Sequence, residues 1–265
     1  MNAQFPTLHQ RTRGTAEVVM ASGRLQRLYT QGSAKAILLH AARPEVVFLN
    51  TAGGLTGGDR LGFSLQADSD TTATTQTAER AYRSEGDTAR LDVALTIARG
   101  RLDWLPQETI LFDRSALRRR TQIALGPEAE CLLLEAVVLG RAAMGETVRD
   151  LSFHDIREVT RAGRPVLVEP VRLSSAALSG PATLQGARAF ASMALIARGA
   201  ADALTPVRAA LDEAGVRGAA SGFDGKLTIR LMAADGWPLR RQIARLLTVL
   251  RTRSMTTPLP RVWQI

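Results

Sequence analysis

The sequence is poor in the residues that usually bind metals tightly or form cross-links. Its 265 residues include one cysteine, Cys131, and three histidines, His9, His40 and His154. A single cysteine excludes an internal disulfide and a thiolate metal cluster within the chain. The histidines are widely spaced and match no zinc-hydrolase pattern. Cys131 lies in an apolar run, which favours a core residue over a nucleophile.

Long hydrophobic runs and aromatic residues are also scarce. No apolar stretch reaches the roughly 18 residues of a membrane span, and the N-terminal residues do not resemble a secretory signal. We therefore expect a cytoplasmic protein that does not enter a membrane. The net charge of +9 comes almost wholly from arginine, since Lys35 and Lys226 are the only lysines. The arginines are spread along the chain and aromatics make up 5%, so nucleic-acid binding is not expected.

Short alternating runs dominate the first 190 residues. Residues 91–97 alternate large apolar with small or polar side chains, which is typical of a half-buried strand. Residues 131–138 predict a central strand buried on both faces, and Ala162-Gly163 indicates a hairpin turn. Many short strands at this spacing predict a mainly β protein, with a large stacked or helical β-sheet structure.

The pattern changes near residue 190, so we expect a β-rich body over residues 1–190 and a small α/β part over residues 191–265 packed on it. This part should carry two helices, one within residues 201–214 and one beginning at Pro238. The second has an apolar stripe formed by Leu239, Ile243, Leu246, Leu247 and Leu250. Its other face is rich in arginine, which is consistent either with solvated charges or with docking of a partner protein.

Residues 50–61 form the most informative stretch, Asn-Thr-Ala-Gly-Gly-Leu-Thr-Gly-Gly-Asp-Arg-Leu. Paired glycines allow positive φ angles and close backbone approach. A phosphate loop would end in Gly-Lys-Ser/Thr, but Gly58 is followed by Asp59 and Arg60, and the glycine spacing does not fit a dinucleotide fingerprint. The loop is therefore not expected to bind a nucleotide.

Five separate stretches, in order along the chain, resemble the family of the urease accessory protein UreD, called UreH in some species. They are residues 53–59 (Gly-Gly-Leu-Thr-Gly-Gly-Asp), 81–84 (Ala-Tyr-Arg-Ser), 102–112 (Leu-Asp-Trp-Leu-Pro-Gln-Glu-Thr-Ile-Leu-Phe), 139–146 (Leu-Gly-Arg-Ala-Ala-Met-Gly-Glu) and 259–263 (Leu-Pro-Arg-Val-Trp). The block at 102–112 is the most specific of them.

This resemblance implies a non-enzymatic role. Proteins of this family help to insert Ni²⁺ into apo-urease, acting with UreF and with the GTPase UreG, which is reached through UreF. The resemblance further implies docking on apo-urease, a dimer of UreD–UreF pairs, and transient Ni²⁺ without a tightly bound cofactor. It also implies a mostly β fold with helix-like stacking.

In this family acidic residues line an internal passage proposed to carry nickel. The matching positions are Asp59, Glu135 and Glu169, together with Glu79, which aligns with a position that is not always acidic. Oxygen ligands hold a first-row divalent ion more weakly than imidazole or thiolate, which suits a conduit better than a store. Two structural alternatives remain open: Asp59 caps its glycine turn, and Glu135 pairs with an arginine such as Arg141.

A second functional class is also consistent with the sequence. A β-rich hydrolase with paired carboxylates would act on a sugar or another small substrate. No spacing among the glutamates singles out an acid and a base. Turnover without any partner would favour this alternative, whereas association with UreF would favour the accessory protein.

Overall fold

The computed structural model describes residues 11–39, 43–179, 182–252 and 258–264, which form two packed β-sheets with helices on one side. The first sheet has seven strands in the order β14-β13-β11-β8-β5-β1-β2. Their bounds are β1 (Arg13–Ala21), β2 (Arg24–Gly32), β5 (Arg60–Ala67), β8 (Ala89–Ile97), β11 (Ser115–Leu125), β13 (Leu151–Arg161) and β14 (Arg164–Ser174).

The second sheet has ten strands, and its main order is β16-β17-β15-β12-β9-β6-β4-β3. These strands are β3 (Ala34–Leu39), β4 (Glu45–Asn50), β6 (Thr71–Gln76), β9 (Arg101–Leu105), β12 (Glu130–Leu139), β15 (Ala189–Ile196), β16 (Val216–Phe223) and β17 (Lys226–Ala233). Two short strands, β7 (Glu79–Ala81) and β10 (Thr109–Leu111), pair with each other, and β10 also pairs with β12.

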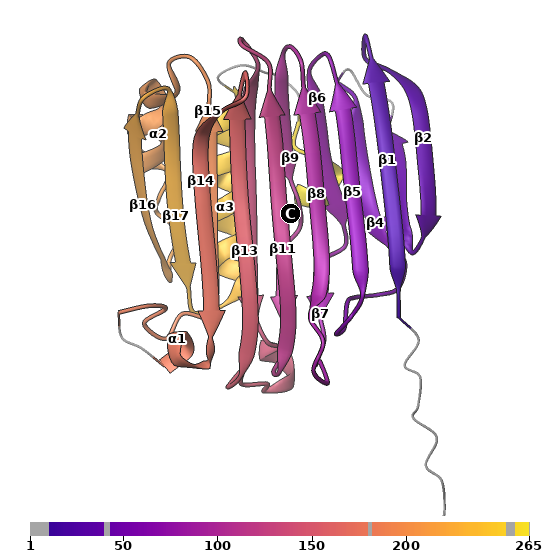
Figure 1. The fold of residues 1–265 in the computed structure, drawn as a ribbon. Helices are drawn as coiled ribbons and strands as arrows, with labels where there is room; N and C mark the ends of the chain where they lie inside the picture. The colour runs from indigo at the N-terminus through magenta and orange to yellow at the C-terminus, as the bar shows by residue number, and fades with distance from the viewer. Residues whose placement is uncertain (1–10, 40–42, 180–181, 253–257, 265) are drawn as a thin grey trace, which may run out of the picture.

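The middle of the chain winds between the two sheets. From β4 to β13 the main strands enter the second and the first sheet in turn, and neighbouring strands within each sheet run parallel. Antiparallel strands flank this winding on both sides. The prediction of a mainly β protein with helical stacking is therefore confirmed, and Figure 1 shows the first sheet with its strands side by side.

Residues 191–265 extend the second sheet, because β15 pairs directly with β12 and β17 pairs with β15. The division at residue 190 stays a prediction about folding units. The helices of this part are α2 (Leu204–Ala209) and α3 (Gly236–Thr252), with short 3-10 turns η2 (Ala200–Ala203) and η3 (Arg261–Trp263). Elsewhere lie α1 (Ser175–Ser179) and the 3-10 turn η1 (Ala142–Met144). No helix in the described ranges is long and apolar enough to cross a membrane.

The helix expected within residues 201–214 is shorter than the sequence pattern indicates. α2 ends at Ala209, and the side chain of Gln242 from α3 then binds the backbone. Its Nε2 donates to the carbonyl of Ala210 over 2.7 Å, and its Oε1 accepts from the N–H of Glu213 over 3.0 Å. A tertiary contact thus takes the backbone groups that a longer helix would have paired.

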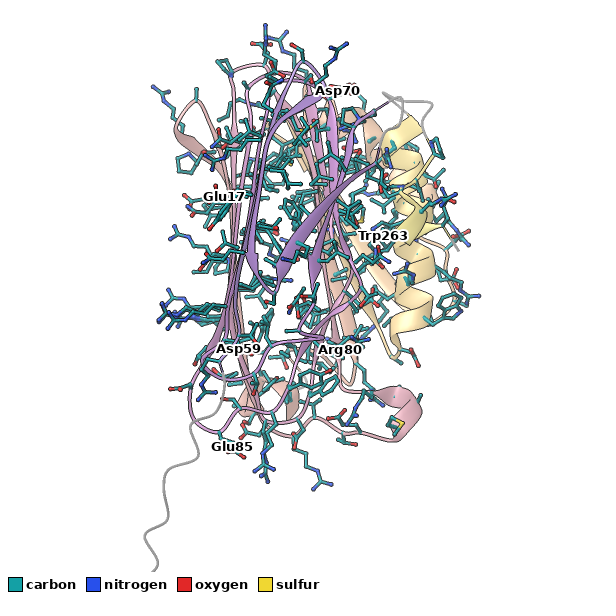
Figure 2. The ribbon with its side chains drawn as sticks, turned by 90° about the vertical axis from the view of Figure 1, so that its right-hand side faces the viewer. Glu17, Asp59, Asp70, Arg80, Glu85 and Trp263 are labelled. Carbon is teal, nitrogen blue, oxygen red and sulfur yellow. The ribbon has the colours of Figure 1, made fainter. Side chains whose placement is uncertain are left out.

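Two hydrophobic cores hold the layers together. One fills the space between the sheets and includes Cys131, whose burial raises the pKa of its thiol, as expected of a core residue. The other lies between the second sheet and α3, where all five residues of the predicted apolar stripe are buried. Figure 2 shows these layers edge-on, with Trp263 beside α3. The Nε1 of Trp263 donates to the carbonyl of Leu105 over 2.8 Å.

The arginines of α3 pair with acids of the same chain. Arg240 contacts Glu108, and Arg241 and Arg245 both contact Glu213. Much of the positive face of this helix is therefore neutralised within the protein. These ion pairs link α3 to neighbouring segments, while the side chains of Arg241 and Arg245 remain 47% and 43% exposed. Docking of a partner on this face stays a prediction.

Candidate functional site

The second sheet is interrupted in the middle. β6 ends at Gln76 and β7 begins at Glu79, while β9 ends at Leu105 and β10 begins at Thr109. β12 continues past both breaks, pairing with β9 through residues 130–133 and with β10 through residues 137–139. Glu135 lies between these two paired segments and therefore faces the break.

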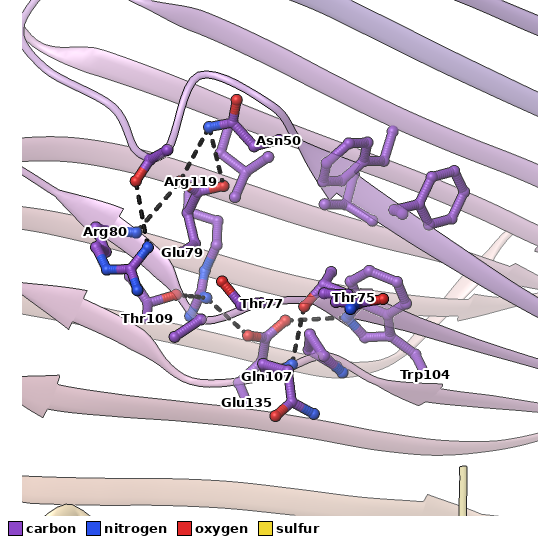
Figure 3. Close-up of a pocket in the computed structure, with 18 residues that line it drawn as sticks. Asn50, Thr75, Thr77, Glu79, Arg80, Trp104, Gln107, Thr109, Arg119 and Glu135 are labelled. Atoms are coloured by element: carbon purple, nitrogen blue, oxygen red, sulfur yellow. Dashed lines mark hydrogen bonds and ion pairs between the residues drawn. The ribbon is translucent and has the colours of Figure 1, made fainter. Parts of the chain in front are cut away.

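A small cavity of about 50 Å³ occupies this break. Its lining includes Glu79, Trp104, Gln107, Arg119 and Glu135, which come from both sheets and from the connections between strands (Figure 3). Pro106 and Gln107 belong to the segment that leaves the sheet, so the polar lining follows from the interruption itself.

Glu79 is one of the two acids that line this cavity. Asn50 Nδ2 donates to Glu79 Oε1 over 3.1 Å. Burial raises the pKa of the Glu79 carboxyl to about 7, although the hydrogen bond from Asn50 opposes the shift. The carboxyl is thus partly protonated at neutral pH. A carboxyl with a pKa perturbed in this way inside a cavity is a candidate functional group.

The glycine loop borders the same cavity. Gly53 is part of the lining, and Leu55 exchanges backbone hydrogen bonds with Arg80 and Tyr82, each over 2.7 Å. A Cβ on Gly54 would approach the carbonyl oxygen of Arg80 to 2.7 Å. The glycines therefore let the loop pack closely on the segment that carries Glu79.

A larger cavity of about 400 Å³ lies between the sheets on the other side of Arg119 and Glu135. These two residues line both cavities. Asp155, Arg157 and Arg230 also line the larger cavity. The side chain of Arg230 is 55% exposed, so the lining reaches the surface at this end.

Register explains why charged side chains meet between the sheets. Arg119 on β11 is the cross-strand partner of Asp155 on β13, and Arg157 is the partner of Glu169 on β14. Residues 155 and 157 share the inner face of β13 with Phe153 and Val159, which are buried. From the second sheet, Glu135 points into the same space. We call Arg119, Glu135, Asp155, Arg157 and Glu169 the buried charge network.

Arg119 is the centre of this network. Its Nε and Nη2 donate to the two oxygens of Asp155 over 3.0 and 2.9 Å. Its Nη1 donates to Thr109 Oγ1 over 2.8 Å and lies 2.8 Å from Glu135 Oε2. Glu135 Oε1 accepts from Trp104 Nε1 over 3.1 Å. A planar guanidinium suits this arrangement because its donors form a rigid fork.

The network continues towards the surface through Arg157. Its Nε lies 3.3 Å from Asp155 Oδ2, and its Nη1 lies 3.4 Å from Glu169 Oε2. Glu169 also contacts Arg230 and accepts from Ser192 Oγ over 3.3 Å. Positive and negative side chains therefore alternate from the small cavity to the exposed Arg230.

The two acids next to Arg119 differ in their electrostatics. Burial raises the pKa of the Glu135 carboxyl, and Arg119 opposes this shift only in part. Burial also disfavours the ionised Asp155, but the attraction of Arg119 outweighs it and holds the pKa of Asp155 below its usual range. Glu135 is therefore the acid in this pair that more readily takes up a proton.

The structure brings together three of the four acids predicted to form a nickel path. Glu79 and Glu135 line the small cavity, and Glu169 joins the far side of the network. Glu135 pairs with Arg119, and the arginine suggested by the sequence, Arg141, pairs with Glu146 instead. The proposed role of these acids in carrying Ni²⁺ stays a prediction.

Asp59 lies in a different environment. Its Oδ1 accepts from the backbone N–H of Thr12 over 2.7 Å, and its Oδ2 accepts from that of Thr56 over 2.8 Å. It belongs to neither cavity lining, and Figure 2 places it at the end of the first sheet. Its contacts are those of the capping alternative.

Sequence reasoning missed Asp155 and the arginines of the network. The available signal was a charged residue at an inward position of an alternating strand, since Asp155 and Arg157 fall in register with Phe153 and Val159. Of the histidines, His154 lies on β13, and His9 and His40 lie outside the described residues. Within the described ranges, no three His, Cys, Asp or Glu side chains converge as a metal site.

Comparison with known proteins assigns the chain to the accessory proteins of urease. The family model described as UreD urease accessory protein matches residues 8–264. A urease accessory protein UreD of Cereibacter sphaeroides strain ATCC 17025 is 56% identical, with both chains covered in full. The protein of the same name from Paracoccus denitrificans is 53% identical over the whole of this chain and 96% of its own. The chain therefore belongs to the UreD family.

Proposed function

We propose that this protein is a non-enzymatic maturation factor that docks on apo-urease and, with UreF and UreG, delivers Ni²⁺ to the urease active site. Membership of the UreD family supports the urease maturation role. The observation that carries the delivery step is a line of acids inside the protein: Glu79 and Glu135 line the small cavity, Glu135 also lines the large one, and Glu169 contacts Arg157 in the wall of the large one. We call this line the passage.

The chemistry of the passage suits a transient cargo. Carboxylate oxygens bind first-row divalent ions less tightly than imidazole or thiolate. A micromolar site corresponds to about −8 kcal/mol and a picomolar site to about −16 kcal/mol, and only the weaker one releases its ion readily. Ni²⁺ is the cargo here, so no resident cofactor is required.

Exposed apolar side chains support the proposal that this protein binds partner proteins. On β2 and β3, at one side of both sheets, five large side chains are between 39% and 48% exposed: Leu25, Leu28, Tyr29, Ile37 and Leu39. A groove of about 280 Å³ at the start of α3 is lined by Trp237, which is 55% exposed. Apolar surface of this kind is typical of protein contacts. We propose these surfaces for UreF and apo-urease, in an assembly that pairs two UreD–UreF units.

The arrangement of the acids favours this function over a hydrolase. A carboxylate-dependent hydrolase needs an acid and a second carboxylate on either side of a substrate. Here Glu135, Asp155 and Glu169 each contact an arginine and are buried between the sheets. These contacts are those of a charge-compensated interior.

The proposed function predicts that urease activation depends on this chain. Urease activity and nickel content are measured in cells that express urease with UreF and UreG, with and without this protein. We expect nickel-free urease to accumulate only when the chain is absent. Full nickel loading in both cases would contradict the maturation role.

The passage predicts a specific defect for Glu169→Gln. This change keeps the shape of the side chain and removes its charge, so the passage attracts Ni²⁺ less strongly. We expect the rate of urease activation to fall about tenfold, the effect of a loss of about 1.4 kcal/mol of ion stabilisation. The matched control is Glu158→Gln on β13, which pairs with Arg120 and is not part of the network. Equal rates for both variants would contradict a passage through Glu169.

A further inference from the structure

Arg119 occupies the place where the two cavities meet. It lines both of them, and its guanidinium contacts Asp155 as well as Glu135 and Thr109. Figure 3 shows its contacts with Glu135 and Thr109. A cation that moves from the small cavity to the large one must therefore pass beside a fixed positive charge. A passage built only to attract cations would have no such residue where its two cavities meet.

The charges along the passage balance one another. The acids Glu135, Asp155 and Glu169 are in contact with the guanidinium groups of Arg119, Arg157 and Arg230. A second cation can gain a carboxylate oxygen here only by displacing a guanidinium and by tolerating its repulsion. Arginine does not lose its proton in proteins, so this competition persists at all physiological pH values.

We propose that Arg119 is an internal counter-cation that prevents the carboxylates of the passage from retaining a divalent ion. The ion then advances by exchange with the guanidinium, which swings from one carboxylate while keeping another. This inference rests on the proposed function in taking Ni²⁺ as the cargo. Without the charge of Arg119, Glu135 and Asp155 become a retaining site for the same ion.

The test compares Arg119→Gln with Arg119→Lys in the full-length chain. Glutamine removes the charge and still donates hydrogen bonds, whereas lysine keeps the charge. Ni²⁺ binding to the purified proteins is measured by equilibrium dialysis. We expect Arg119→Gln to lower the Kd at least about tenfold, because a buried opposite charge is no longer compensated. Arg119→Lys should remain close to the wild-type value.

A double variant checks which oxygens hold the ion. Adding Glu135→Gln to Arg119→Gln removes the carboxylate that loses its arginine partner, whereas Asp155 keeps Arg157, and should return the Kd to the wild-type range. Retained tight binding in the double variant would show that the ion binds elsewhere. That result would overturn the assignment to Arg119.

Arg157→Gln keeps the test decisive if Arg119→Gln does not fold, as judged by circular dichroism. Arg157 contacts Asp155 and Glu169, so its loss should also tighten Ni²⁺ binding. The inference would be overturned if every glutamine variant that folds binds Ni²⁺ with the wild-type Kd.

Urease loading is measured separately, so that the two proposals can fail independently. If the wild-type chain is not needed for loading but Arg119→Gln binds Ni²⁺ more tightly, the counter-cation role stands and the delivery function fails. If the wild-type chain supports loading and neither glutamine variant binds more tightly, the delivery function stands and the role of Arg119 fails.

Discussion

Replacing Asp103 by asparagine should lower the free energy of unfolding by about 3–5 kcal/mol, because it removes the buried carboxylate that three arginines share. Asp103 lies on the outer face of β9 beneath α3 and is fully buried. Arg101 Nε lies 2.8 Å from its Oδ1, and Arg251 Nε and Arg43 Nη1 lie 3.2 and 3.5 Å from its Oδ2. Three positive side chains from distant parts of the chain thus share one carboxylate.

The pKa values of the buried arginines depend on Asp103. Burial lowers the pKa of Arg43 and of Arg251, and the attraction of Asp103 opposes that shift in both. Asparagine keeps the shape of the side chain but removes the nearest negative charge from these arginines in a low-dielectric interior. The penalty is the cost of the remaining buried charges and exceeds the value of any single hydrogen bond.

Urea denaturation of the two proteins measures the effect. The matched control is Glu128→Gln, which loses an ion pair with Arg198 whose side chains are 70% and 85% exposed. Exposed pairs contribute at most about 1 kcal/mol, so this control should be nearly neutral. A loss below about 1 kcal/mol for Asp103→Asn would show that the arginines relax towards other partners.

The elements of the fold were largely predictable from local patterns. Residues 91–97 and 131–138 form strands β8 and β12, and the expected hairpin turn at Ala162-Gly163 joins β13 to β14 with positive φ at both residues. The apolar stripe of α3 identified its buried face. These features depend on neighbours within a few residues, which is why the sequence reveals them.

The winding and the charge network depend on contacts between distant residues. Arg119 meets Asp155 because β11 and β13 pair in parallel at one register, and a slip of β13 by one residue would turn Asp155 to the outer face. No local pattern fixes that register. The resemblance to UreD supplied Glu79, Glu135 and Glu169 as acids of interest, but it did not supply the arginines that compensate two of them.

Replacing Glu79 by glutamine should stabilise the protein increasingly as pH rises. The pKa of the folded-state carboxyl is about 7, above the ordinary value of 4.5, because burial disfavours its ionised form. The folded state therefore binds more protons than the unfolded state between these pH values, and wild-type stability falls as pH rises through this window. Glutamine has no proton to lose and escapes this loss, while its oxygen can still accept from Asn50.

The expected gain for Glu79→Gln is about 1 kcal/mol at pH 5 and about 3 kcal/mol at pH 8, since each pKa unit corresponds to about 1.4 kcal/mol. Urea denaturation of both proteins at several pH values measures it. Glu128→Gln, measured in parallel, reports the effect of removing one acid from a chain of net charge +9. A constant difference between Glu79→Gln and wild type across this range would contradict a buried, proton-binding Glu79. That result would mean that ionising Glu79 at neutral pH costs the folded protein little.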